Sequence, residues 1–215
     1  EHSGKEKLLG NLENEGNKLT VNIEDISNKN WHDILQLIGY ETKFDVIEEN
    51  FHFKNGRNAT LTIDTSGTSL FKRGYRTEKG GAPLKENMAA ALVMLTNWFP
   101  DKPFYDPCCG SGTIPIEAAL IGLNIAPGLN RSFAAEKWTF FDPKAFDTVR
   151  QEARKEIRTD VTLDILGADI DGSMIEIAKQ NAIKAGVSEH IEFKQMQLKD
   201  FRTKKENGVL VANPP

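Results

Sequence analysis

The sequence has few of the features that would assign a protein at first sight. Its only two cysteines in 215 residues, Cys108 and Cys109, are adjacent, so they provide neither loop-closing disulfides nor the spaced ligand pairs of a zinc site. No apolar run reaches the roughly 18 residues of a membrane-spanning helix. The charged stretch Glu1–Leu9 lacks the apolar segment of a signal peptide. We therefore expect a soluble, cytoplasmic protein that binds no metal.

The chain also lacks the positive charge of proteins that coat nucleic acids. It has 27 Lys and Arg against 31 Asp and Glu, a net charge of -4, whereas bulk electrostatic binding needs a broadly cationic surface. One basic segment between Ser69 and Lys85 is the exception. Two interpretations stay open for it: a solvated linker or a contact with RNA. The predicted RNA contacts are Lys72, Arg73, Tyr75 and Arg76.

Hydrophobic residues make up 39% of the chain, which is enough for one domain and part of a second. Residues 1–65 are predicted to form part of a small α+β domain. A helix-like stretch occurs at Trp31–Ile38, and strand-like alternation lies on both sides of the turn-forming pair Asn55-Gly56. Glycine-punctuated residues 66–83 are predicted to be a basic linker.

Residues 84–215 alternate between helical and strand patterns. The first helix is expected where Leu84, Met88, Leu92 and Leu95 recur at helical spacing before Pro100, and we expect this apolar face to pack on a sheet. The other predicted helices are 114–121, 144–157 and 174–185, and the predicted strands are 104–105, 163–168, 191–196 and 209–212. This alternation indicates a parallel, doubly wound α/β sheet.

Ligands of open parallel sheets bind outside the carboxyl ends of the strands, near the reversal of strand order. The first predicted strand ends at Asp106, and Gly110 and Gly112 follow just before a helix. Positions without a side chain let backbone N–H groups approach a ligand. The two glycines alone are weak evidence, because they could simply form a tight turn.

The next two strand ends also carry acids. Asp169 ends the second strand, where a carboxylate can accept hydrogen bonds from both hydroxyls of a ribose. It lies far more than the roughly 20 residues past the glycines that the dinucleotide fingerprint requires, so a Rossmann dehydrogenase is disfavoured. Asp171 is predicted to be the N-cap of the following helix. After the third strand, Asp200 is placed to meet an adenine amino group and Phe201 to stack on the ring, although Asp200 could equally be a surface turn residue.

The most specific signal is Asn213-Pro214-Pro215 after the fourth strand. An exocyclic amino nitrogen of a base is a poor nucleophile, because its lone pair is delocalised into the ring. An Asn amide oxygen and a carbonyl fixed by prolines can accept the two amino hydrogens and aim the lone pair at a sulfonium methyl group. A plain strand stop is the alternative. A polar Asn that closes an apolar strand, level with Asp106 and Asp169, favours the catalytic interpretation.

Taken together, these motifs resemble those of the bacterial THUMP-domain RNA methyltransferases. This family includes the guanine-N2 methyltransferases of large-subunit ribosomal RNA, often labelled as N6-adenine-specific DNA methylases. The match covers about residues 60–215. The segments that carry it are Asp106–Ala119, Asp169–Asp171 and Asn213–Pro215, with Leu70–Arg76, Ala82–Glu86 and Asn124–Gly128, which generic methyltransferases lack.

The resemblance implies a Rossmann-like class I methyltransferase sheet in residues 84–215, incomplete after its fourth strand and preceded by part of a small α+β domain. It implies S-adenosylmethionine as cofactor, with the methionine part near Asp106 and the glycines, the ribose on Asp169 and the adenine near Asp200. The predicted cofactor residues are Asp106, Cys108, Gly110, Ser111, Gly112, Thr113, Asp169, Ile170, Asp200 and Phe201. Asn213, Pro214 and Pro215 would present the target amino group. The irregular stretch 124–160 is expected to be an insertion over the cofactor side.

The activity implied is methylation of an exocyclic amine of an RNA base, most specifically guanine N2 in 23S ribosomal RNA. Two alternatives stay open: adenine-N6 methylation of DNA, and a non-catalytic RNA-binding module. Asn213-Pro214-Pro215 cannot separate adenine N6 from guanine N2, because both are conjugated amines. RNA is the expected partner, and no membrane contact is expected.

Overall fold

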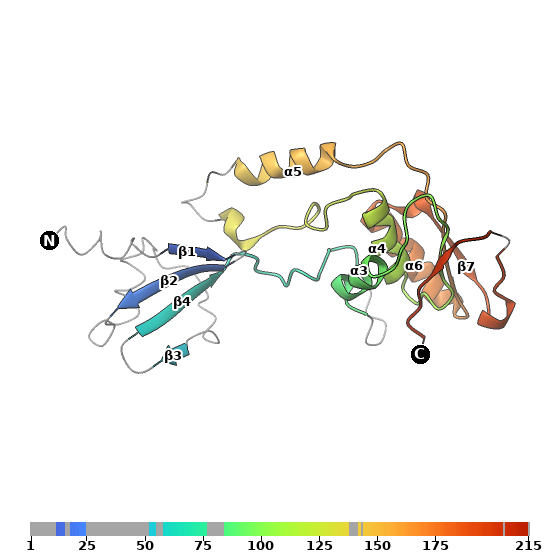
Figure 1. Ribbon diagram of the computed structural model, residues 1–215, viewed down its shortest axis with the longest axis horizontal. Coiled ribbons are helices and arrows are strands. Elements are labelled where there is room, and N and C mark those ends of the chain that lie inside the picture. Colours follow the sequence, from blue (N-terminus) through green and yellow to red (C-terminus); the bar gives the residue numbers. More distant parts are fainter. Residues whose placement is uncertain are drawn as a thin grey trace. The chain divides into compact units, whose positions relative to one another are not determined.

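The structure is a computed structural model that describes residues 12–15, 18–24, 52–54, 58–76, 84–137, 142, 144–203 and 205–214. The chain divides into two compact units. One contains residues 1–67 and 133–137, and the other contains residues 68–132 and 138–215. Each unit has its own sheet (Figure 1).

The first unit contains a four-stranded antiparallel sheet with strand order β1-β2-β4-β3 (Figure 1). Its strands are β1 (Leu12–Glu15), β2 (Lys18–Glu24), β3 (His52–Lys54) and β4 (Asn58–Asp64). Lys54 pairs with Asn58, which confirms strands on both sides of Asn55-Gly56. The turn itself and the predicted helix Trp31–Ile38 lie outside the described residues.

The second unit contains a parallel sheet with strand order β7-β6-β5-β8. Its strands are β5 (Phe104–Asp106), β6 (Ile165–Asp169), β7 (Ile191–Gln195) and β8 (Val209–Leu210), and its helices are α3 (Glu86–Met94), α4 (Thr113–Gly122), α5 (Ala145–Lys155) and α6 (Gly172–Ala185). The predicted order of elements is confirmed. The fold is the expected Rossmann-like α/β arrangement.

Helices α3, α4 and α6 form one layer over this sheet (Figure 1). Helix α4 contacts β5, β6 and β7, α6 contacts β6 and β7, and the two helices contact each other, so both cover the same face. Almost every residue of α4 is buried, as expected for a helix that is apolar on all sides. Phe104, Ile116 and Ala182 are fully buried at the centre of the core.

Helix α3 packs through only part of the predicted apolar face, since Leu84 and Leu92 lie against the core. Met88 is 50% exposed and Leu95 is 84% exposed, whereas Ala89 and Val93 are buried. The main contact of the helix is with α4. The small side chain of Ala89 fits this close contact between helices, whereas Met88 and Leu95 remain outside.

The described part of the basic segment is only partly exposed to solvent. Tyr75 is only 4% exposed and belongs to the hydrophobic core of the second unit. The predicted insertion also differs from expectation at its ends. The Arg158 amide donates to the Leu123 carbonyl and the Asn124 side chain to the Glu156 carbonyl. These bonds lie at the C-terminal end of α4, away from the glycine loop, so the described ends do not cover the cofactor side.

Candidate cofactor and substrate site

Asp106 and Asp169 end neighbouring strands beside the point where the strand order reverses. The chain runs outward from β5 to β6 and β7 and then returns to β8 on the other side of β5, which makes the carboxyl ends of β5 and β8 the expected ligand crevice. Asp106 ends β5 and Asp169 ends β6. The Val211 amide donates to the Tyr105 carbonyl over 2.9 Å and so directs the chain toward Asn213 at the same edge.

Gly110 and Gly112, in the loop between β5 and α4, have different surroundings. Their φ angles are +51° and +82°, in the left-handed region that favours glycine. At Gly112, an added Cβ atom would lie 2.9 Å from the Ala178 Cβ and 3.1 Å from the Phe193 ring. At Gly110, it would meet no heavy atom within 4 Å. Gly112 therefore provides close packing, whereas Gly110 faces open space that a ligand can approach.

The Asp169 carboxylate connects this loop to β6. Its Oδ2 accepts a hydrogen bond from the Gly110 amide and its Oδ1 from the Asp171 amide, each over 2.9 Å. A carboxylate has lone pairs beyond these two, so it can still accept from the hydroxyls of a ribose. Asp171 accepts from the Ser173 amide over 2.8 Å, which confirms it as the N-cap of α6. Ile170, between the two acids, is 65% exposed.

Asp106 is a buried acid with an unusual pKa. The residue is 1% exposed, and its Oδ1 accepts from the Cys108 amide over 3.1 Å. Burial raises its pKa from 3.8 to about 7, the Cys108 amide lowers it, and the charge of Asp169 raises it further. A cationic group of a ligand beside this carboxyl would favour its ionised form.

The two cysteines of the loop are not activated nucleophiles. Burial is the main cause that raises the pKa of both thiols, and the charges of Asp106 and Asp169 raise them further. Both therefore remain thiols near neutral pH, and the thiolate is the reactive form. Cys108 contributes to the loop through its backbone amide.

Asn181 of α6 is a site residue that the sequence interpretation missed. Its side chain is completely buried, and its Nδ2 donates to the Ser111 carbonyl over 3.0 Å. Its Oδ1 has no hydrogen-bond partner among the residues that the structure describes. The Asn181 side chain thus stabilises the glycine loop through the Ser111 carbonyl. A polar residue between the buried Ala178 and Ala182 was the available signal, since buried polar groups need partners.

The end of the third strand is less closely tied to the site. Asp200 lies exposed at the end of the short helix η4 (Leu198–Asp200). The ring of Phe201 packs edge-on against Tyr105, with centroids 5.7 Å apart. Their contacts with adenine stay predictions. Asn213 and Pro214 are exposed beyond β8, and Pro215 lies outside the described residues.

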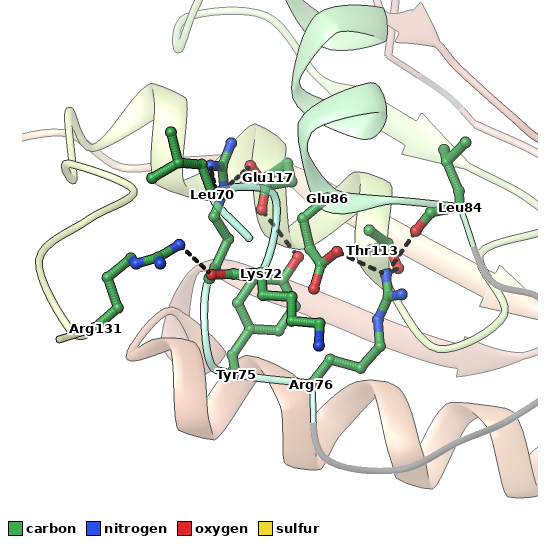
Figure 2. Close-up of polar contacts among 10 residues, drawn as sticks. Leu70, Lys72, Tyr75, Arg76, Leu84, Glu86, Thr113, Glu117 and Arg131 are labelled. Carbon is green, nitrogen blue, oxygen red and sulfur yellow. Dashed lines mark hydrogen bonds and ion pairs between the residues drawn. The ribbon is translucent and has the colours of Figure 1, made fainter. Parts of the chain in front are cut away.

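Three described residues of the basic segment, Arg73, Tyr75 and Arg76, are held in a polar network (Figure 2). The Tyr75 hydroxyl donates to Glu117 Oε1 over 2.9 Å, and Arg73 Nε lies 3.6 Å from Glu117 Oε2. Burial, followed by the charge of Glu117, raises the pKa of Tyr75 well above 10.0. Burial also raises the pKa of Glu117, although Arg73 opposes this. Arg73 therefore anchors the segment to α4.

Arg76 makes the corresponding contacts closer to the glycine loop (Figure 2). Its Nη2 donates to the Leu84 carbonyl over 2.7 Å and to Thr113 Oγ1 over 2.8 Å, and it lies 3.9 Å from Glu86 Oε2. The side chains of Arg73 and Arg76 are each 14% exposed, whereas Lys72 is exposed. As RNA contacts, these residues stay a prediction. The sequence interpretation missed both acidic partners.

Within the described part of the chain, no three His, Cys, Asp or Glu residues gather where they could hold a metal ion. Among the helices of those same residues, none is long and apolar enough to cross a membrane.

Comparison with known proteins gives consistent matches. The model of the RMKL-like methyltransferase domain family matches residues 73–215. YpsC of Bacillus subtilis, provisionally named as an RNA methyltransferase, is 57% identical over 157 residues, 73% of this chain and 41% of its own. The ribosomal RNA large subunit methyltransferase K/L of Aliivibrio salmonicida is 42% identical over 171 residues, 75% of this chain and 24% of its own.

Two solved structures share the fold at high identity. One is a predicted N6-adenine-specific DNA methylase from Listeria monocytogenes, with a TM-score of 0.71 and 60% identity, covering 74% of this chain and 42% of its own. The other is SMU.472, a provisionally named methyltransferase complexed with SAH, with a TM-score of 0.71 and 55% identity, covering 77% of this chain and 43% of its own. The chain thus spans about two fifths, or less, of the length of these relatives.

Proposed function

Because the chain belongs to the RMKL-like methyltransferase domain family, we propose that the protein transfers a methyl group from S-adenosylmethionine to an exocyclic amine of an RNA base. Relatives named as RNA methyltransferases and a similar structure with bound SAH support this proposal. Within RNA, we propose guanine N2 of 23S ribosomal RNA as the target. The observation that supports the proposal is that Asp106 and Asp169 end neighbouring parallel strands, and that β8, which leads to Asn213, pairs in parallel with β5.

The residues at this edge fit the cofactor. Gly110 leaves open space on one side of the loop, where backbone groups can approach the methionine part. Asp169 offers carboxylate oxygens to the ribose, and Ile170 offers an exposed apolar surface beside it. We assign the adenine end to Asp200 and Phe201. The cofactor supplies an electrophilic methyl group on a sulfonium.

The chain's own chemical contribution is to position the amine. Asn213 can accept one amino hydrogen with its amide oxygen, and the Pro214 carbonyl, fixed by the ring of Pro215, can accept the other. Both bonds favour a pyramidal nitrogen whose lone pair points away from the base ring. This arrangement needs no strong base, which fits a site whose cysteines are not thiolates.

Binding of the RNA is the second part of the proposal. Lys72 is the exposed cation of the four predicted contacts, and we assign it to a phosphate of the RNA. Arg73, Tyr75 and Arg76 would act by holding the segment in place through Glu117 and Glu86. The net charge of -4 makes a local contact of this kind more suitable than a broad cationic surface. We expect the protein to act in the cytoplasm.

A methyl-transfer assay with the full-length protein tests the proposal. Labelled S-adenosylmethionine is offered with unmodified ribosomal RNA and, separately, with unmethylated DNA. Label should enter the RNA, nucleoside analysis should give N2-methylguanosine, and Asn213→Ala should lower the rate by about 100-fold or more with unchanged affinity for SAH. Asn97→Ala, at an exposed position after α3, is the matched control and should keep full activity.

The other results of the assay separate the alternatives. Label only in DNA, recovered as N6-methyladenine, would replace RNA by DNA as the substrate. Normal SAH binding with no transfer to either polymer would favour a non-catalytic RNA-binding module.

A further inference from the structure

Glu86, the first residue of α3, has a buried carboxylate that lacks a full set of partners. Its side chain is 4% exposed, and its Oε2 accepts no hydrogen bond from any residue that the structure describes. The cation paired with it, Arg76, is 3.9 Å away at Nη2, which is too far for a hydrogen bond. A buried charge without hydrogen bonds is costly. The site around Glu86 therefore fits a further, positively charged donor.

Glu117, a second buried acid of the same network, has a hydrogen-bond donor as well as an arginine beside it. It accepts a 2.9 Å hydrogen bond from Tyr75 and lies 3.6 Å from Arg73 (Figure 2). The two acids are both buried and each lies beside an arginine of the basic segment. Among the residues that the structure describes, none donates a corresponding hydrogen bond to Glu86 Oε2. The missing hydrogen bond makes Glu86, rather than Glu117, the candidate for binding a ligand.

The position of Glu86 relates it to the cofactor loop. Arg76 Nη2 donates to the side chain of Thr113, the first residue of α4, directly after Gly112. Arg76 Nε is also buried without a hydrogen-bond acceptor in the described part of the chain. A carboxylate and a guanidinium N–H therefore both lack partners beside the start of α4. This helix end adds free backbone N–H groups and partial positive charge.

A zwitterion satisfies both groups at once. We propose that Glu86 binds the α-ammonium group of the methionine part of S-adenosylmethionine, and that Arg76, with the start of α4, binds its α-carboxylate. An ammonium donates only and a carboxylate accepts only, so each end of the amino acid meets its complement. The inference rests on the cofactor of the proposed function and does not depend on which base is methylated. Neither residue is among the cofactor residues expected from the sequence.

Binding measurements with two ligands test this assignment. Calorimetric titrations of the full-length protein use S-adenosylhomocysteine and 5′-methylthioadenosine, which keeps the nucleoside and thioether but lacks the amino-acid end. Glu86→Gln should weaken the binding of S-adenosylhomocysteine about 10- to 100-fold, the usual range for a charged hydrogen bond. Its effect on 5′-methylthioadenosine should be less than about twofold. Arg76→Lys should give the same selective loss, because lysine lacks the forked donors of arginine.

Tyr75→Phe is the matched control, since it disturbs the neighbouring acid, Glu117, in the same network. It should change the two affinities by the same small factor. Equal losses for both ligands in Glu86→Gln, or no loss for S-adenosylhomocysteine, would overturn the assignment and leave Glu86 a purely structural residue.

A second measurement keeps the proposal testable if Glu86→Gln does not fold. The wild-type protein is titrated with S-adenosylhomocysteine analogues that lack either the amino group or the carboxylate. The loss of either group should weaken binding by about tenfold or more. An analogue that binds as tightly as S-adenosylhomocysteine would contradict the proposal. No RNA is present in these titrations, so failure to methylate RNA and failure of this assignment give separate results.

Discussion

The Gly110 amide donates a hydrogen bond to the Asp169 carboxylate over 2.9 Å, although 59 residues separate the two along the chain. The bond joins the loop after β5 to the end of β6. The Cys109 amide adds a second connection, to the Ala168 carbonyl over 2.8 Å. The loop proposed to hold the methionine part and the acid proposed to bind the ribose are therefore connected directly, and a change in either should affect the other.

Gly110→Ala and Gly112→Ala should separate cofactor contact from packing. Both force alanine into the left-handed region, which costs roughly 1 kcal/mol. Gly112→Ala also places a Cβ atom 2.9 Å from Ala178, and such overpacking adds about 1–3 kcal/mol. We expect urea unfolding to show the larger loss for Gly112→Ala. Gly110→Ala should lose little stability yet lower the affinity for SAH, because its new methyl group enters the open space of the loop. Equal loss of stability in both variants would contradict this division.

Asp106 should make the stability of the cofactor-free protein depend on pH. Its pKa is about 7 in the folded chain, against 3.8 ordinarily. Between these values the folded state holds a proton that the unfolded state has lost. Stability therefore falls as pH rises from about 4 to 7, at a limit near 1.4 kcal/mol per pH unit, and then levels off.

Asp106→Asn cannot titrate, so its stability should lack this decline. The free energy of unfolding of both proteins is measured in urea at pH 5, 6, 7 and 8. The difference in favour of the variant should grow up to about pH 7. Asp101→Asn changes an exposed acid and should follow the wild-type curve. Parallel curves for wild type and Asp106→Asn would show that the folded pKa is not raised.

The cysteines should react slowly in the folded protein. The pKa of each thiol is raised, chiefly by burial, so little thiolate is available for alkylation. Iodoacetamide at pH 8, followed by mass spectrometry of the peptide, should label Cys109 least and both residues several-fold faster in urea. Fast labelling of Cys108 in the folded state would mean that the loop activates this thiol.

Local sequence signals predicted most of the second unit. The apolar strands, the left-handed glycines and the acids at strand ends act over a few residues, so β5, β6, α6 and the Asp171 cap could be read from the sequence. The packing face of α3 could not, because Ala89 and Met88 are both compatible with a helix and only the position of α4 decides which is buried.

The buried contacts of Arg73, Tyr75 and Arg76 were not predicted, for a related reason. Its charges suggested solvent or RNA, but the partner of Tyr75 is Glu117, 42 residues away along the chain. Charge patterns within the segment contain no information about that partner. A signal did exist in α4, where Glu117 lies inside a run of apolar residues, since a charge buried there needs a polar partner from elsewhere in the fold.

Lys72→Ala should affect mainly RNA binding, whereas Tyr75→Phe should affect mainly stability. Tyr75→Phe removes the 2.9 Å hydrogen bond to the buried Glu117, which should cost about 1–3 kcal/mol in urea unfolding and lower RNA affinity less than Lys72→Ala does. Lys72→Ala changes an exposed side chain, so stability should stay within about 0.5 kcal/mol. RNA affinity should fall, and its logarithmic dependence on salt should lose about one unit of slope, as for one phosphate contact. Filter binding over a salt series measures both quantities. A lysine that contacts a phosphate releases counterions from the RNA on binding, so its removal must change the slope. An unchanged slope in Lys72→Ala would therefore place the phosphate contacts on another surface of the protein.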